Sequence, residues 1–211
     1  MGQPVVHGPS FSTYVRSVRL ALHEKGVEHK LVEVDLLGGA HKKAPYVSLQ
    51  PFGKVPAFEH DGNTFYETSA ILRYIDEVFQ GPALMPSTPA ARALANQVMS
   101  IVDSYGYTPS VTNLFIPRVL VPSMGGETDM AKVEAAKEPA ALFVKELERL
   151  LGGQTFFGGA SVCLADTHTL PVLVYLRATP EGKSLLDSAP KLSSWLGRML
   201  ERASVRAMMP S

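Results

Sequence analysis

The residues best suited to chemistry stand in two short stretches, Gly53–Phe58 and Glu67–Ile71. In the first, Lys54-Val55-Pro56 forms an extended segment that ends in proline. X-Pro bonds adopt the cis form at low cost, and a cis proline before a strand turns a backbone edge toward solvent. In the second, an acid and two hydroxyls precede an apolar helix, whose first N–H groups can bind a carboxylate. Together these features suit one small zwitterionic peptide.

Each stretch also has a purely structural interpretation. Proline is tolerated in an edge strand whether or not a ligand binds there. Thr68, or Ser69 in its place, suits the N-cap of an ordinary helix. The two stretches alone therefore leave both interpretations open.

The elements that must position these residues are predicted from hydrophobic periodicity. In the first part of the chain, Val15, Val18 and Leu22 repeat at helix spacing, and Lys25-Gly26 supplies a helix stop. Asp61-Gly62-Asn63 is a strong hairpin turn. The predicted order is β-α-β, a loop, then β-β-α, with strands at Val5–His7, Lys30–Val34, Ala57–His60 and Thr64–Tyr66 and apolar helix stripes at Val15–Leu22 and Ile71–Phe79.

The second part of the chain is predicted to be an all-helical bundle. The proline-rich residues 81–88 read as a linker between an α/β domain, residues 1–80, and a helical domain, residues 89–211. The expected helices run from Pro89 to about Val121, through Phe143–Leu151, from Leu164 to about Arg177, and through Leu192–Met199. The third is apolar almost all round, which predicts a buried central helix.

Composition limits the possible functions. The chain has 211 residues, 45% of them hydrophobic, which is enough for a full core. Twenty basic side chains balance 20 acidic ones, so no global field attracts nucleic acid or an anionic membrane. The single cysteine, Cys163, cannot form an internal disulfide, and the six histidines show no zinc spacing. We therefore expect a soluble cytoplasmic protein without a bound metal or a membrane-spanning segment.

These motifs and their order resemble the soluble glutathione transferases, whose first domain is thioredoxin-like. The resemblance covers nearly the whole chain, and the residues of these motifs are most similar to those of the phi class. It rests on Gly8–Leu22, His41-Lys42, Pro51–Ala57, Glu67–Ile71 and Leu164–Pro171. It implies an enzyme that uses glutathione as a co-substrate and holds no tightly bound cofactor.

The resemblance implies that Ser12 is the catalytic residue. A free thiol is only a few per cent thiolate at pH 7, so the enzyme must stabilise the anion. A serine hydroxyl at the start of the first helix can donate a hydrogen bond to the sulfur, beside the helix N–H groups. The structural alternative is an ordinary N-cap. Ser10 is the main rival for the role and Tyr14 a lesser one.

The resemblance also assigns the glutathione-binding residues. Val55, before Pro56, would pair with the cysteinyl backbone, while Glu67 and Thr68 would bind the γ-glutamyl ammonium and carboxylate. The cationic or donor groups that match the family's places for the glycyl carboxylate are His41, Lys42 and Lys54. The family often has glutamine at the position of Lys54, and lysine predicts a stronger, more salt-sensitive contact.

The electrophile is expected against apolar side chains from both domains. The candidates are Phe11, Tyr105, Tyr107, Phe115 and Val119, each of which could equally belong to the core or to a dimer surface. The resemblance implies that Phe52 is an anchor into a partner subunit of a homodimer, and the structural alternative is local packing of its loop. Asp166 is expected to be structural, in a capping box that has Cys163 where the family usually has serine or threonine.

The predicted activity is addition of the glutathione thiolate to small hydrophobic electrophiles, a detoxification chemistry. Two alternatives remain: a glutathione-dependent peroxidase or isomerase on the same fold, and a non-catalytic carrier of glutathione or hydrophobic ligands.

Overall fold

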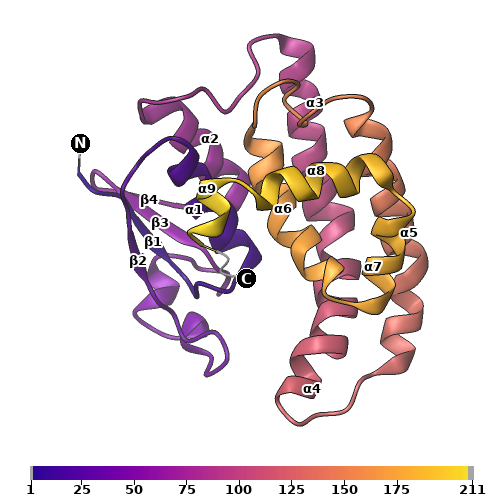
Figure 1. Ribbon diagram of the computed structural model, residues 1–211. Helices are drawn as coiled ribbons and strands as arrows, with labels where there is room; N and C mark the ends of the chain where they lie inside the picture. The colour runs from indigo at the N-terminus through magenta and orange to yellow at the C-terminus, as the bar shows by residue number, and fades with distance from the viewer. Residues whose placement is uncertain (1, 209–211) are drawn as a thin grey trace. The chain divides into compact units, whose positions relative to one another are not determined.

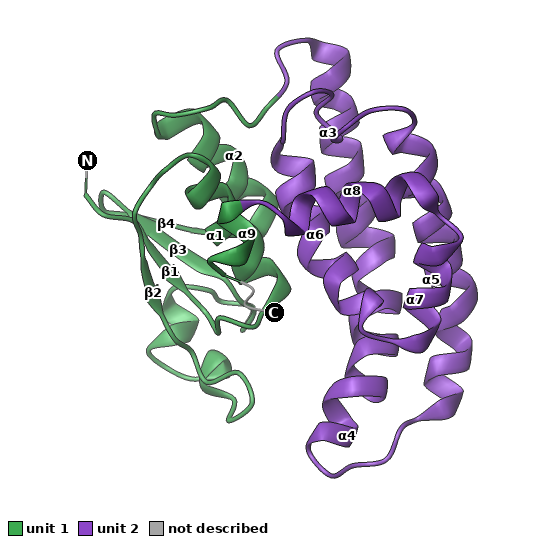
Figure 2. Ribbon diagram, viewed as in Figure 1, with its two compact units in different colours: residues 1–85, 203–211 green, residues 86–202 purple. Residues whose placement is uncertain are grey.

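The computed structural model describes residues 2–208, which divide into two compact units. Unit 1 contains the residues up to Met85 together with the segment that begins at Ala203. Unit 2 is Pro86–Arg202 (Figure 2). The expected order, β-α-β and then β-β-α followed by an all-helical half, is confirmed (Figure 1).

Unit 1 is built on a four-stranded sheet with the order β2-β1-β3-β4. The strands are β1 (Val5–His7), β2 (Lys30–Val32), β3 (Ala57–His60) and β4 (Asn63–Tyr66). β1 is parallel to β2 and antiparallel to β3, which is antiparallel to β4. β2 ends two residues earlier than expected. In the β3–β4 turn, Asp61 and Gly62 take the positive φ values, while Asn63 already belongs to β4.

Two helices of unit 1 bury their apolar stripes and pack against each other: α1 (Thr13–Glu24) and α2 (Thr68–Val78). Val15, Val18 and Leu22 of α1 are completely buried, as their spacing predicts. The α1 helix stops at Gly26, whose φ of 70° suits glycine. Between β2 and β3 the chain forms two short 3₁₀ turns, η1 (Ala40–Lys42) and η2 (Tyr46–Ser48).

A buried ion pair explains why unit 1 extends to Met85 rather than ending at residue 80. The Lys25 ammonium lies 3.0 Å from the Asp76 carboxylate. The same carboxylate accepts the N–H groups of Leu84 at 2.7 Å and Met85 at 3.0 Å. The first part of the proline-rich segment is thus bound to α2 and does not act as a free linker.

A short C-terminal helix, α9 (Ala203–Arg206), also belongs to unit 1, although the sequence interpretation left the whole chain after residue 89 in the helical domain. It packs against α1, and Ser204 donates a hydrogen bond to the Glu24 carboxylate. Unit 1 is therefore assembled from two separate parts of the chain.

Unit 2 is entirely helical except for short connections. Its α-helices are α3 (Pro89–Ile101), α4 (Val121–Ser123), α5 (Met130–Leu151), α6 (Leu164–Arg177), α7 (Pro180–Asp187) and α8 (Pro190–Leu200). Between α3 and α4 the chain continues in a wider π-helical winding, as η3 (Val102–Gly106) and η4 (Thr108–Leu120). The expected helix from Pro89 to Val121 is thus continuous, and Pro109 and Pro117 lie in its π-helical part.

The centre of unit 2 is α6, which is buried along most of its length, as predicted. Its N-cap is Cys163, and the Asp166 carboxylate accepts the Cys163 N–H at 2.8 Å. The other oxygen of Asp166 accepts the N–H of Phe157 at 2.9 Å and the indole N–H of Trp195 at 2.7 Å. Asp166 is completely buried, and its role in the structure is that of a helix cap.

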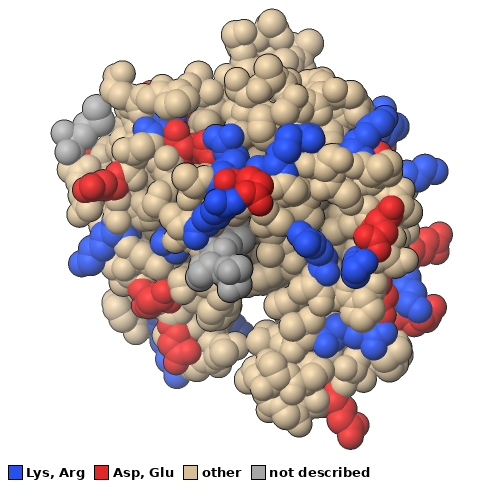
Figure 3. Space-filling model, viewed as in Figure 1, with Lys and Arg blue, Asp and Glu red and all other residues tan. Residues whose placement is uncertain are grey.

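On the surface shown in Figure 3, basic and acidic side chains are interspersed and do not gather in a patch of one sign. Among the described helices, none combines the length and the apolar character needed to cross a membrane.

Candidate functional site

Three of the predicted site segments adjoin the same end of the sheet in unit 1. His7, the last residue of β1, pairs with Ala57 at the start of β3, which in turn pairs with Tyr66 at the end of β4. The loop to Ser12, the Val55-Pro56 segment and the Glu67 turn therefore begin from adjacent positions. Gly8 provides a direct contact, since a Cβ there would lie 2.5 Å from Val15 and 3.2 Å from Val55. Only glycine, with its φ of 149°, lets these segments approach so closely.

Ser12 is the N-cap of α1. Its Oγ accepts the N–H of Val15 at 3.5 Å, and its carbonyl accepts the N–H of Arg16 at 2.9 Å. Because Oγ acts as an acceptor toward the helix, its own proton remains available for a second partner. Ser12 thus has the geometry of an ordinary cap and keeps one donor for a bound anion.

The two rivals of Ser12 are placed differently. Ser10 is exposed, and its backbone N–H donates to the Glu33 carboxylate, at 3.2 Å from each oxygen. Tyr14 lies within the first turn of α1, beyond the cap. Only Ser12 stands at the N-cap position.

The Val55-Pro56 peptide bond is cis. β3 begins only at Ala57, and among the described residues the Val55 backbone makes no hydrogen bond. Its N–H and C=O remain available to pair with another extended peptide, as in β-augmentation. A second cis bond, Ala44-Pro45, was not anticipated from the sequence.

Glu67, rather than Thr68 or Ser69, occupies the N-cap position of α2, so the expectation of a hydroxyl cap is wrong. Its φ is 68°, uncommon for a residue with a side chain, and no side chain caps the helix. Ala70 and Ile71 donate their N–H groups to the Glu67 carbonyl. The N–H groups of Thr68 and Ser69 therefore point out of the helix without a partner among the described residues.

His41, Lys42 and Lys54 come together on the segment around η1. A Cβ on Gly53, which has a φ of 59°, would contact the His41 carbonyl at 3.3 Å and the Lys42 side chain at 3.4 Å. Burial lowers the pKa of His41, and the positive charges of Lys42 and Lys54 lower it further. The two lysines thus place positive charge beside His41, and the Asp35 carboxylate, which raises the pKa of His41, partly opposes their effect. The Nδ1 atom of His41 is buried without a hydrogen-bond partner in the described part of the chain.

Two residues that hold Lys54 in place were missed by the sequence interpretation. The Tyr46 hydroxyl donates to the Lys54 carbonyl at 2.7 Å, and burial raises the pKa of Tyr46 to about 12. The Gln50 side-chain oxygen accepts the Lys54 N–H at 3.0 Å. The spacing of these residues gives no signal for this role, because the contacts depend on the fold of η2.

The hydrophobic candidates are divided between the units. Phe11, in unit 1, is 41% exposed. In unit 2, Tyr105 is 69% exposed, and Phe115 stacks on Tyr175 with ring centroids 4.1 Å apart. Burial raises the pKa of the half-buried Tyr107, with a further contribution from Tyr175. Val119, on η4, is also half-buried.

The remaining candidate is Phe52, which is 70% exposed beside Tyr66, with ring centroids 6.0 Å apart. Cys163, in contrast, is buried in unit 2, and burial raises the pKa of its thiol, so it is not a candidate nucleophile.

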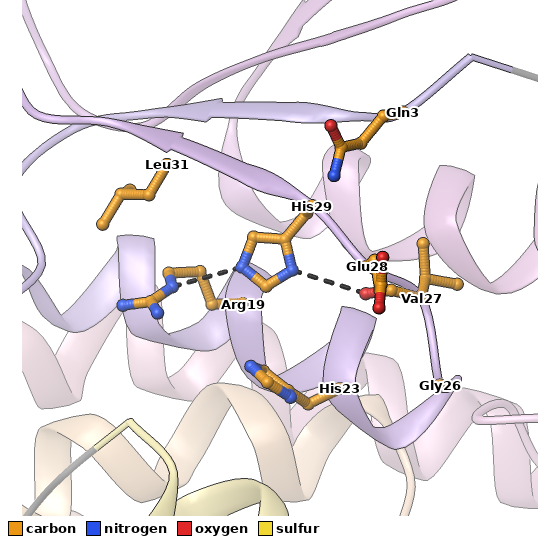
Figure 4. Close-up of a pocket in the computed structure, with 8 residues that line it drawn as sticks. All are labelled: Gln3, Arg19, His23, Gly26, Val27, Glu28, His29 and Leu31. Carbon is orange, nitrogen blue, oxygen red and sulfur yellow. Dashed lines mark hydrogen bonds between the residues drawn. The ribbon is translucent and has the colours of Figure 1, made fainter.

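A separate hollow of about 460 Å³ lies between the second half of α1 and the start of β2 (Figure 4). It is lined by Gln3, Arg19, His23, Gly26, Val27, Glu28, His29 and Leu31, none of which is a predicted site residue. Arg19 Nε donates to His29 Nε2 at 3.2 Å, which requires that nitrogen to be unprotonated. Burial, the largest cause, lowers the pKa of His29 in agreement.

Comparisons with known proteins match both units. The family model described as "Glutathione S-transferase, N-terminal domain" matches residues 11–78, and "Glutathione S-transferase, C-terminal domain" matches residues 107–203. Glutathione S-transferase F7 of Arabidopsis thaliana is 33% identical over 205 residues, covering 97% of this chain and 98% of its own.

Solved structures agree. Glutathione transferase F7 from Populus trichocarpa has a TM-score of 0.86 at 28% identity, over 97% of each chain. A theta class glutathione S-transferase from Xanthomonas axonopodis pv. citri, solved with glutathione bound, has a TM-score of 0.83 at 25% identity, over 100% of this chain and 99% of that one. With its serine-capped α1, its cis Val55-Pro56 bond and the uncapped start of α2, this chain belongs to the glutathione S-transferase family and is most similar to its plant phi-class members.

Proposed function

We propose that this protein conjugates the glutathione thiolate to small hydrophobic electrophiles and that Ser12 is the catalytic residue. The observation that carries the proposal is the common sheet edge from which Ser12, Val55 and Glu67 depart. A serine donor, a backbone segment suited to pairing and an open helix start therefore follow or precede adjacent strand ends, which supports the binding of one extended peptide.

Each end of glutathione has a complementary group. The γ-glutamyl carboxylate binds the free N–H groups and the hydroxyl at the start of α2, and the ammonium pairs with Glu67. The cysteinyl backbone pairs with Val55. The glycyl carboxylate binds the cluster of His41, Lys42 and Lys54, where the two lysine charges favour an anion.

The Ser12 hydroxyl then donates to the cysteinyl sulfur. Lowering a thiol pKa by two units requires about 2.7 kcal/mol, which one charge-assisted hydrogen bond and the N-terminal end of α1 can provide together. The thiol proton leaves to water, and the sulfur forms a bond to an electrophilic carbon as a halide departs or a strained ring opens. Serine serves as a donor throughout and never as a base.

The electrophile side of the proposal is less specific. Phe11, Tyr105, Tyr107, Phe115 and Val119 are proposed to contact the hydrophobic substrate. A homodimer is also proposed, with Phe52 as its anchor, because an aromatic side chain 70% exposed to solvent is suited to a partner's pocket. A cytoplasmic location is proposed on the basis of the lone, unpaired cysteine.

One preparation, assayed with a chloronitrobenzene and with cumene hydroperoxide, tests the proposed reaction. We expect the conjugation rate to exceed the peroxidase rate. A dominant peroxidase activity would favour the first alternative. Retention on immobilised glutathione without turnover of either substrate would favour the carrier.

A further inference from the structure

The turn that leads to Ser12 is held by two side chains outside the predicted site, those of Glu33 and Arg16. Ser10, two residues before Ser12, donates its N–H to the Glu33 carboxylate at 3.2 Å from each oxygen. Its carbonyl accepts a hydrogen bond from Arg16 Nε at 3.0 Å. Glu33 directly follows β2, and Arg16 lies in the first turns of α1. One residue of the turn is therefore tied both to the sheet and to the helix.

The rest of the turn is fixed by backbone hydrogen bonds. Gly8 donates to the Val32 carbonyl at 3.0 Å, and Ser12 donates to the Pro9 carbonyl at 2.9 Å. Between these two points, Ser10 is fixed by the side chains of Glu33 and Arg16. Their contacts can be altered without changing any residue of the turn.

The negative charge of Glu33 would by itself destabilise a thiolate at the start of α1. Its proposed contribution to catalysis is therefore not an electrostatic stabilisation of that anion. A carboxylate near the start of α1 disfavours a second anion there, such as a thiolate. Arg16 donates a hydrogen bond to the carbonyl of the same residue, Ser10. Glu33 also interacts electrostatically with Arg19: it raises the pKa of Arg19, although burial, the larger effect, lowers it. We therefore assign the role of Glu33 to its acceptance of the Ser10 N–H rather than to its charge.

We propose that Glu33 is a positioning residue for Ser12: with Arg16 it holds Ser10, and so it fixes the turn that directs the Ser12 hydroxyl toward the substrate sulfur. This inference rests on the proposed function, in which Ser12 donates to bound glutathione.

The test compares Glu33→Ala, which removes both acceptor oxygens, with Glu33→Gln, which removes the charge and keeps one acceptor oxygen. The matched control is Glu28→Ala, a nearby exposed glutamate outside the turn. For each purified full-length variant, kcat, the KM for glutathione and the apparent pKa of the bound thiol are measured, and thermal melting verifies folding. Loss of one hydrogen bond predicts that Glu33→Ala lowers kcat about tenfold and raises the thiol pKa, with little change in KM. Glu33→Gln should restore most of the rate, and Glu28→Ala should match the parent.

A lower thiol pKa and a faster rate in both Glu33 variants would overturn the inference, because removal of a negative charge alone predicts that result. Unchanged kinetics in Glu33→Ala would also overturn it. The double variant of Ser12→Ala with Glu33→Ala should be no slower than Ser12→Ala alone, since Glu33 acts through Ser12. If Ser12→Ala itself retains full activity, the assignment of Ser12 fails, which is a different outcome from loss in Ser12→Ala with no effect in Glu33→Ala.

Discussion

The starts of α1 and α2 follow strands that end at the same side of the sheet, but the two helices differ in how their first N–H groups are satisfied. In α1 the Ser12 hydroxyl accepts a helix N–H and thereby occupies part of the positive end of the helix. In α2 the N-cap residue is Glu67, whose side chain makes no capping bond, and the N–H groups of Thr68 and Ser69 have no partner within residues 2–208. The first helix start offers a neutral donor and the second an anion site. One suits a sulfur that must ionise, and the other a carboxylate that is already ionised.

Among the variants that test this comparison, Ser12→Ala is expected to have the largest effect on the rate. Removal of one donor to a developing anion typically costs a factor of about 10² to 10³ in rate, so we expect a loss of that size and a higher apparent pKa of the bound thiol. Retention on immobilised glutathione should remain near normal, because the α2 start is intact. Ser10→Ala and Tyr14→Phe are the matched controls. An unchanged rate in Ser12→Ala would shift the role to one of them.

Asp166→Ala tests the third way to begin a helix, a buried carboxylate cap. Three N–H groups would lose their acceptor in the interior of unit 2. We expect the free energy of unfolding to fall by about 2 kcal/mol or more and the melting temperature by at least about 4 °C. Asp187→Ala, at an exposed ion pair with Lys183, is the control and should melt near the parent. Equal melting of both variants would contradict the capping role.

Glu67→Gln tests the open helix start directly. It keeps the side-chain shape and removes the charge that pairs with the glutathione ammonium. We expect the KM for glutathione to rise about tenfold, the value of a charge-assisted contact, with kcat at saturation close to the parent. Glu77→Gln, exposed on the same helix, provides the control. A fall in kcat at constant KM would place Glu67 in the chemical step instead.

The positive cluster predicts a smaller, salt-dependent effect. Lys54→Gln should raise the dissociation constant of S-methylglutathione about threefold at low ionic strength and less in 0.5 M salt, where charge interactions are screened. Calorimetric titrations at two salt concentrations measure it. A loss of affinity that does not depend on salt would indicate that the contact is not ionic. Lys43→Gln, at a neighbouring lysine outside the candidate set, is the control.

The smallest predicted effect is on pH dependence through His41. Its pKa is lowered, first by burial and then by Lys42 and Lys54, so the imidazole is neutral at pH 7.5 and gains a charge as the pH falls through its pKa. The glycyl carboxylate stays ionised over that range. S-methylglutathione, which has no titrating thiol, should therefore bind up to about twofold more tightly at pH 5.5, with proton uptake. His41→Gln should abolish this dependence, and its persistence in that variant would exclude His41.

The parts of the fold that were predictable from the sequence are those coded by local patterns. The stripe of Val15, Val18 and Leu22 and the stop at Gly26 fix α1, and with them the cap position of Ser12. The α7 helix was missed because only Gly182 and Leu186 are buried, which leaves no stripe to recognise.

Other features depend on contacts between segments distant in sequence. The extension of unit 1 to Met85 follows from Asp76, and the turn before Ser12 is held by Glu33; neither pairing has a local signal. The absence of a hydroxyl cap on α2 depends on the positive φ of Glu67. The preference of serine and threonine for N-caps predicted a hydroxyl cap instead, because an ordinary helix is stabilised when a side chain accepts its free N–H groups.

The return of α9 to unit 1 has a consequence for how the protein can be dissected and made. A fragment that stops at residue 80 lacks the hydrogen bonds that Leu84 and Met85 donate to Asp76, and one that stops at Met85 still lacks Ser204, the partner of Glu24. Ribosomal synthesis delivers that last piece only after the whole of unit 2. Unit 1 therefore receives its last segment only after the rest of the chain has been synthesised, although its sequence begins first.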